Sequence, residues 1–196
     1  SKINFSKSDG LPSIKKVANY EKKSGITFDR KNNNKFTNDI DSLSELNKLI
    51  GLNDVKQLIK ELRAYTLIQK ARAREKLIYD SMALHMIFKG SPGTGKTTVA
   101  RIMGKFFKEI GLLSKGHLVE VERADLVGEY IGHTAVKTKE TLQRALGGIL
   151  FIDEAYSLAR GGEKDFGREA IDCIVKGMED HKNNIVIILA GYKLEM

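Results

Sequence analysis

A glycine-rich segment between a strand-like run and a helix-like run constrains the fold of this chain more than any other feature. The segment has the spacing G-x-x-x-x-G-K-T and comprises Gly90, Ser91, Pro92, Gly93, Thr94, Gly95, Lys96 and Thr97. Residues 84–89 before it are mostly apolar, and residues 98–107 after it carry apolar side chains at helical spacing. A strand, a loop of this spacing and a helix in this order predict a phosphate-binding loop.

The chemistry of such a loop follows from its backbone and its last residues. Successive N–H groups and the positive end of the helix dipole converge on one anion, and glycines allow a close approach. Lys96 can reach the β- and γ-phosphates of a nucleotide, and the Thr97 hydroxyl can ligate Mg²⁺. We therefore expect residues 90–97, together with Thr98, to bind a nucleotide. The plain alternative is a glycine-rich turn with a chance lysine, which both flanks disfavour.

A second segment, residues 148–154, supplies the acidic groups that a nucleotide-hydrolysing site needs. Its four apolar residues, 149–152, predict a central strand buried on both faces, and Asp153 and Glu154 follow at the carboxyl end of that strand. We expect Asp153 to hold Mg²⁺ through a water and Glu154 to orient or deprotonate the attacking water. The acidic pair favours ATP, and the chain has no Asn-Lys-x-Asp segment of the kind that reads guanine. A strand that ends in a solvated acidic turn is the alternative.

The order of apolar patterns predicts an α/β fold. Strand-like runs at 84–89, 118–122, 149–153 and 185–190 alternate with helical patterns at 97–110, 134–146 and 167–180. Strands that alternate with helices imply a parallel sheet covered by helices on both faces, which is a three-layer arrangement. Ahead of these elements, residues 42–45 (Ser-Leu-Ser-Glu) predict a capping box, and a longer helix is expected from about Asp54 to Lys76.

Charge is concentrated at the N-terminus. Residues 1–40 contain nine Lys or Arg and four Asp or Glu, which is +5 of the net charge of +8. We expect a flexible basic tail over 1–40, most simply a solvated linker, and a folded domain over 41–196. The alternative for the tail is an arm that binds nucleic acid or an acidic partner.

The single cysteine and the apolar runs bear on the compartment. Because Cys173 is the single cysteine, the chain cannot form an intrachain disulfide. Its apolar neighbours predict that it packs in a helix. No apolar run approaches the length of a membrane span, and no hydrophobic signal segment is present. We expect a cytoplasmic protein that does not insert into a membrane.

Three further segments carry a family resemblance. They are residues 115–118 (KGHL), 122–134 (ERADLVGEYIGHT) and 151–162 (FIDEAYSLARGG). With the phosphate-binding loop they resemble the AAA+ ATPases, and among them the CbbX/SpoVK branch, whose sporulation-related members are more similar to the chain than its red-type rubisco activases. The resemblance covers roughly residues 42–196. It implies a P-loop NTPase fold, the Walker A and Walker B roles for the two motifs above, ATP or ADP and Mg²⁺ as cofactors, and a sporulation-related role.

The resemblance also implies roles for particular residues. Ile50, Gly51 and Leu52 stand where such ATPases pack the adenine. Tyr130, Ile131 and Gly132 resemble the pore loop that grips an extended polypeptide in the channel of a hexamer, with a half-buried loop aromatic as the alternative for Tyr130. Tyr192 stands where many relatives place a polar sensor, often Asn, so this sequence departs from the family there.

The same resemblance implies parts that would follow Met196. These are an arginine finger, a fifth strand and a helical lid. We therefore expect the chain to be the N-terminal part of a longer protein, weak or inactive alone. Without the fifth strand, residues 84–89 would form an exposed sheet edge.

Three functions compete on this basis. The first is an ATP-driven remodeller of a protein substrate, working as a homo-oligomeric ring because the γ-phosphate charge needs an arginine from the neighbouring subunit. The second is a nucleic-acid motor or clamp-loader-like ATPase, which the apolar loop at Tyr130 disfavours because phosphate contacts favour Lys or Arg. The third is a switch that binds ATP without useful turnover, which Glu154 disfavours.

Overall fold

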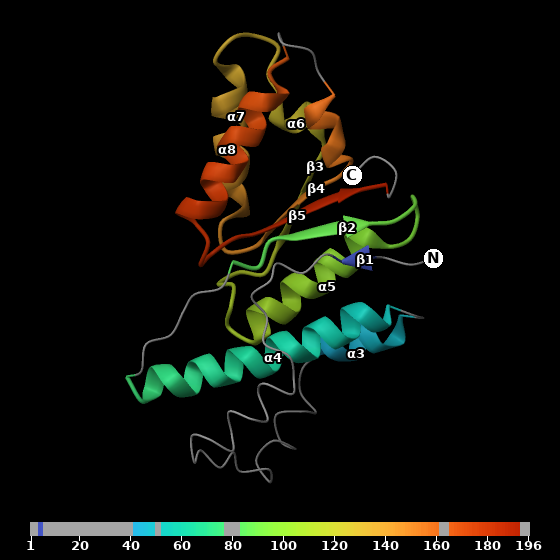
Figure 1. The fold of residues 1–196 in the computed structure, drawn as a ribbon, viewed down its shortest axis with the longest axis vertical. Coiled ribbons are helices and arrows are strands. Elements are labelled where there is room, and N and C mark those ends of the chain that lie inside the picture. The colour runs from blue at the N-terminus through green and yellow to red at the C-terminus, as the bar shows by residue number, and fades with distance from the viewer. Residues whose placement is uncertain (1–3, 6–40, 50–51, 77–82, 161–164, 193–196) are drawn as a thin grey trace. The chain divides into compact units, whose positions relative to one another are not determined.

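The computed structural model describes residues 4–5, 41–49, 52–76, 83–160 and 165–192. These residues belong to two compact units. One unit contains residues 4–5, 83–160 and 165–192, and the other contains residues 41–49 and 52–76. The larger unit holds the sheet, and Figure 1 shows its strands with helices on both faces.

The core of the larger unit is a parallel sheet. Its strands are β2 (Met86–Lys89), β3 (Leu118–Val121), β4 (Ile149–Ile152) and β5 (Val186–Gly191), in the spatial order β2-β5-β4-β3. All three neighbouring pairs of these strands are parallel. The predicted parallel α/β sheet is therefore confirmed, with strand ends within two residues of those expected from the sequence.

The outer edge of β2 is paired over a short stretch. The two-residue strand β1 (Asn4–Phe5) runs antiparallel to β2, with Asn4 opposite Lys89 and Phe5 opposite Phe88. Backbone N–H and C=O groups on an open edge gain hydrogen bonds from such pairing. The expectation of an exposed edge at residues 84–89 is thus wrong for Phe88 and Lys89. The remaining residues of the predicted tail lie outside the described residues.

Helices cover the two faces of the sheet (Figure 1). Helix α5 (Lys96–Glu109) packs on β3 and β4 from one face and buries seven residues, Val99, Ala100, Ile102, Met103, Gly104, Phe106 and Phe107. On the other face, α7 (His133–Ala145) and α8 (Gly167–Asp180) share an apolar cluster with β3, β4 and β5. Complete burial of β4 explains its uninterrupted apolar sequence, since each large side chain removed from water contributes about 1.5–3 kcal/mol.

Two short elements were not expected from the sequence. Helix α6 (Arg123–Leu126) begins with a capping box, in which the Glu122 N–H donates to Oδ2 of Asp125 at 2.9 Å. The 3₁₀ helix η1 (Ala155–Ala159) follows the acidic pair. Both are shorter than two helical turns, so apolar periodicity gives no signal for them.

The smaller unit consists of α3 (Asp41–Lys48) and α4 (Asn53–Arg74). The predicted helix over 54–76 is confirmed. The predicted capping box is wrong, because α3 already begins at Asp41 and Ser42 lies buried in its first turn. Lys56 of α4 donates a hydrogen bond to the Leu49 carbonyl at 2.8 Å and so ties α4 to the end of α3. Among the described helices, none combines the length and apolarity needed to span a bilayer.

Candidate functional site

The phosphate-binding loop connects the carboxyl end of β2 to the first residue of α5. Its start is fixed to the neighbouring strand, since the Gly90 N–H donates to the Gly191 carbonyl at 3.1 Å. Gly93 and Gly95 have φ angles of 70° and 84°, in the left-handed region that favours glycine. A Cβ added at either of these two glycines would meet open space within 4 Å, so the loop curves around a free volume.

Lys96 and Thr97 begin α5 and place their functional groups beside this volume. The Lys96 ammonium donates to the carbonyls of Gly90 at 3.1 Å and Ser91 at 3.2 Å, and its Nζ lies 5.8 Å from the centre of the Tyr192 ring. The Thr97 hydroxyl donates to Oε1 of Glu120 at 2.9 Å. Glu120 lies on β3, and no sequence motif pointed to it.

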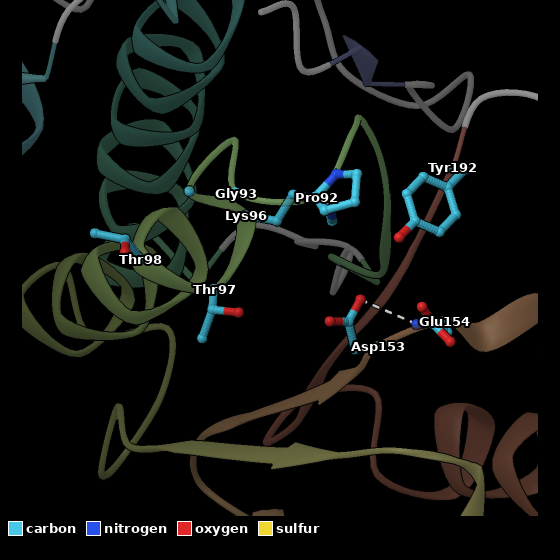
Figure 2. Close-up of a pocket in the computed structure, with 10 residues that line it drawn as sticks. Pro92, Gly93, Lys96, Thr97, Thr98, Asp153, Glu154 and Tyr192 are labelled. Carbon is cyan, nitrogen blue, oxygen red and sulfur yellow. Dashed lines mark hydrogen bonds between the residues drawn. The ribbon is translucent and has the colours of Figure 1, made fainter.

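The acidic pair emerges at the carboxyl end of β4. The Asp153 N–H donates to the Val121 carbonyl at 2.9 Å, which extends the pairing with β3 by one residue. The Glu154 N–H donates to Oδ1 of Asp153 at 3.0 Å (Figure 2). Glu154 has a φ of 47°, a left-handed conformation that costs a non-glycine residue about 1–3 kcal/mol and is most often kept at functional sites. The Glu154 side chain is exposed at this turn.

These segments meet around one open pocket of about 470 Å³ (Figure 2). Its lining residues are Pro92, Gly93, Gly95, Lys96, Thr97, Thr98, Asp153, Glu154, Gly191 and Tyr192. The structure thus brings the two sequence motifs together and adds Tyr192, whose family position was in doubt. Gly90, Ser91 and Thr94 belong to the loop but do not line the pocket. Ile50 and Gly51 lie outside the described residues, and Leu52 belongs to the smaller unit.

The residues around the pocket fit a nucleotide with Mg²⁺. An ammonium, a helix start and left-handed glycines provide for phosphate, while the Thr97 hydroxyl and the Asp153 carboxylate are oxygen ligands of the kind Mg²⁺ takes. Among the described residues, no three His, Cys, Asp or Glu side chains gather into a metal site. A metal here would therefore complete its coordination with phosphate and water, as Mg²⁺ does in phosphate-binding enzymes.

Tyr192 lines the pocket, and a second aromatic ring, that of Tyr156, lies near it. The Tyr156 ring lies 6.1 Å from the Tyr192 ring and 4.5 Å from the Arg160 guanidinium. Partial desolvation and the charge of Glu154 raise the pKa of Tyr156 above its usual value. Its hydroxyl remains a hydrogen-bond donor beside the carboxylates.

The loop at residues 128–132 has a fixed base and an exposed tip. At the base, the Gly128 N–H donates to the Thr134 hydroxyl at 2.9 Å, and the Thr138 hydroxyl donates to the Leu126 carbonyl at 3.0 Å. At the tip, Tyr130 is 66% and Ile131 88% exposed. The half-buried alternative for Tyr130 is therefore wrong, and its ring lies 5.4 Å from the ring of His133.

A bidentate ion pair and one further hydrogen bond join α6 to two later segments, at Asp165 and in η1. Arg123 Nη2 donates to both oxygens of Asp165 at 2.6 and 2.7 Å, and Nη1 donates to the Ser157 carbonyl in η1 at 2.7 Å. Asp165 also accepts the Gly167 N–H at 2.6 Å. The hydrogen bonds from Arg123 hold the pKa of Asp165 below its usual value. Sequence reasoning missed this link, because its two partners are 42 residues apart and the segment that contains Arg123 gives no sign of its partner.

The fold and pocket define a parallel α/β protein with a phosphate-binding loop. Residues 86–196 match the model of the ATPase family associated with various cellular activities (AAA), which is more than half of the chain. The chain belongs to the AAA family. The expected family resemblance is confirmed.

Individual relatives are similar over three quarters of the chain. Stage V sporulation protein K of Bacillus subtilis is 61% identical over 152 residues, 78% of this chain and 47% of that protein. Protein CbbX of Cereibacter sphaeroides is 53% identical over 152 residues, 76% of this chain and 49% of that protein. The chloroplastic ribulose bisphosphate carboxylase/oxygenase activase of Cyanidioschyzon merolae is 52% identical over 150 residues, 76% of this chain and 51% of that protein. The chain spans about half the length of these relatives.

Proposed function

We propose that this protein binds and hydrolyses ATP with Mg²⁺ and uses the cycle to remodel a protein substrate within a homo-oligomeric ring. One observation carries the hydrolytic part of the proposal. The phosphate-binding loop and the Asp153–Glu154 pair, which are more than fifty residues apart in the sequence, line the same pocket. A loop alone would support binding, whereas a carboxylate facing the same volume supports turnover.

The pocket residues divide the work between binding and chemistry. Lys96 and the N–H groups at the start of α5 bind the phosphates, and Thr97 and Asp153 hold the metal. Bound Mg²⁺ would neutralise phosphate charge that develops during transfer. Glu154 orients the attacking water and accepts its proton, a role that contributes about 10²–10⁴-fold in rate. Its exposed carboxylate at the turn after β4 supports this assignment.

The exposed loop supports a polypeptide as the partner. Tyr130 and Ile131 offer apolar area on a base held by α7, and an aromatic ring contacts a peptide of almost any sequence. A nucleic-acid channel would favour Lys or Arg at this tip. The relatives named as a rubisco activase and as a sporulation protein support remodelling and a sporulation-related role in the cytoplasm.

The partner class is tested by ATPase stimulation in the complete protein. We expect an unfolded polypeptide to raise the hydrolysis rate and single-stranded DNA or RNA to leave it unchanged, with Lys96→Ala as the background control. Mass measurement with ATP then reports whether a ring, such as a hexamer, forms. Stimulation by nucleic acid alone would support the motor alternative, and tight binding without turnover in any condition would support the switch.

A further inference from the structure

Glu120 shares a face of the sheet with Asp153. Its neighbours Val119 and Val121 pack into the cluster that α7 and α8 cover, and successive side chains in a strand point to opposite faces. Glu120 therefore points to the face that α5 covers. It pairs in register with Phe151 of β4, and Asp153 lies two residues beyond Phe151 on that same face. Two carboxylates on adjacent strands thus lie on the side of the phosphate-binding loop.

Glu120 also contacts the hydroxyl assigned to the metal. Thr97 Oγ1 donates its proton to Glu120 Oε1 at 2.9 Å. A hydroxyl that donates to a carboxylate keeps its oxygen lone pairs free for a metal. Acceptors of this kind orient a ligand and raise its basicity, and their loss usually weakens metal binding.

We propose that Glu120 is a positioning residue for Mg²⁺, acting through the Thr97 hydroxyl and through its own negative charge. This inference rests on the proposed function, because it concerns the metal that accompanies the nucleotide. Glu120 accepts the Thr97 proton, fixes the hydroxyl rotamer and favours a cation on the α5 side of β3. The opposing view is an ordinary exposed carboxylate on the edge strand β3 whose hydrogen bond has no effect on metal.

The test measures nucleotide affinity rather than turnover. Calorimetric titration of the complete protein with a non-hydrolysable ATP analogue, once with Mg²⁺ and once with a chelator, gives two dissociation constants. The dissociation constant with the chelator, divided by the one with Mg²⁺, gives the contribution of the metal. Glu120→Gln, which keeps the size of the side chain and removes its charge, should lower that ratio about tenfold, the small end of the range for lost outer partners. An unchanged or increased ratio would overturn the proposal.

A matched control separates position from charge. Glu140 is an exposed carboxylate on α7, which covers the opposite face of the sheet. Glu140→Gln makes the same chemical change and should leave the ratio unaltered. If Glu140→Gln lowers the ratio as much as Glu120→Gln, general charge accounts for the effect and the positioning role is rejected.

A double-mutant cycle tests the route through Thr97. Residues in direct contact give non-additive effects, whereas independent residues add. In a Thr97→Ala background, Glu120→Gln should change the ratio by less than about twofold. Fully additive losses would overturn the proposed action through the hydroxyl. Lys96→Ala in the same titration checks the site itself: if it leaves affinity intact, the proposed function fails, and if it abolishes binding while Glu120→Gln is neutral, only this inference fails.

Discussion

The pocket around Lys96 and the loop around Tyr130 present opposite kinds of surface to solvent. The pocket gathers an ammonium, hydroxyls and carboxylates on the ends of strands and on a helix start. The loop tip exposes a phenol ring and an isoleucine, and its base is held by α7. Polar groups that must meet a fixed ligand lie on rigid elements, whereas apolar contact with a variable chain lies on a loop tip.

This contrast predicts that changes in one region spare the work of the other. A pocket substitution should alter ATP binding or turnover, and a tip substitution should alter only the response to substrate. Arg123 lies between them, since it contacts η1 after the acidic pair and begins the helix that leads to the loop. Each variant below tests this division of labour.

The largest effect is expected from Glu154→Gln. The amide keeps the shape of the side chain but cannot accept a proton, so hydrolysis should fall by at least about a hundredfold while ATP stays bound. Phosphate release and calorimetry on the complete protein measure the two quantities, with Glu140→Gln as the control. A normal hydrolysis rate would show that Glu154 is not the catalytic carboxylate.

Lys96→Ala should weaken ATP binding by at least about tenfold, or about 1.4 kcal/mol. The reason is the loss of the ammonium that spans the loop at Gly90 and Ser91. Calorimetric titration measures the change. Unaltered affinity would show that residues 90–97 do not bind the phosphates, and the contrast between the pocket and the loop would fail.

Tyr130→Ala should leave basal hydrolysis intact and abolish stimulation by a polypeptide. Because the side chain is 66% exposed, the melting temperature should hardly move, and the free energy of unfolding should change by less than about 0.5 kcal/mol. Thermal unfolding and stimulated ATPase assays are run together. A variant that still responds fully to substrate, or one that is strongly destabilised, would mean that the loop has been misinterpreted.

Arg123→Lys should partly reduce the stimulation of ATP hydrolysis by a polypeptide. Lysine keeps the charge but cannot hold both Asp165 oxygens and the Ser157 carbonyl in one fork. We expect substrate stimulation to fall about two- to fivefold while ATP affinity is unchanged. Hydrolysis rates with and without the polypeptide measure this effect. An equal fall in both rates would mean that Arg123 stabilises the fold and does not link the pocket to the loop.

The sequence predicts the parts of the molecule that depend on local pattern. The four parallel strands and the loop before α5 follow from apolar runs and glycine spacing, and Asp153 and Glu154 follow from their place after β4. The contact of Glu120 with Thr97 and the pairing of Arg123 with Asp165 depend on how distant segments cross, which no local pattern encodes. Ser42 shows the same limit at small scale, because it is expected to cap the helix from outside, whereas α3 begins at Asp41 and includes it.

His85 provides the smallest expected effect and a control on both regions. Its Nδ1 accepts the Ile187 N–H at 3.1 Å, and its Nε2 lies 3.4 Å from the Met178 carbonyl, so the neutral ring ties the residues before β2 to β5 and α8. Burial lowers the pKa of His85 below 6.5. The hydrogen bond from Ile187 requires an unprotonated Nδ1, so this contact also belongs to the neutral ring.

The sign of the pH dependence follows from that lowered pKa. Above about pH 6.5 both folded and unfolded states hold neutral His85, and its titration contributes nothing to stability changes. Below that pH the unfolded state binds the proton first, so the free energy of unfolding falls, by at most about 1.4 kcal/mol per pH unit, until the folded pKa is reached. Denaturant unfolding at pH 7.5 and 5.5 measures the slope, and His85→Gln should flatten it. A slope that is equally steep in this variant would assign the pH dependence to other groups. His85→Gln should leave ATP affinity at pH 7.5 unchanged. A changed affinity would mean that the pocket depends on the end of β2 opposite the phosphate-binding loop.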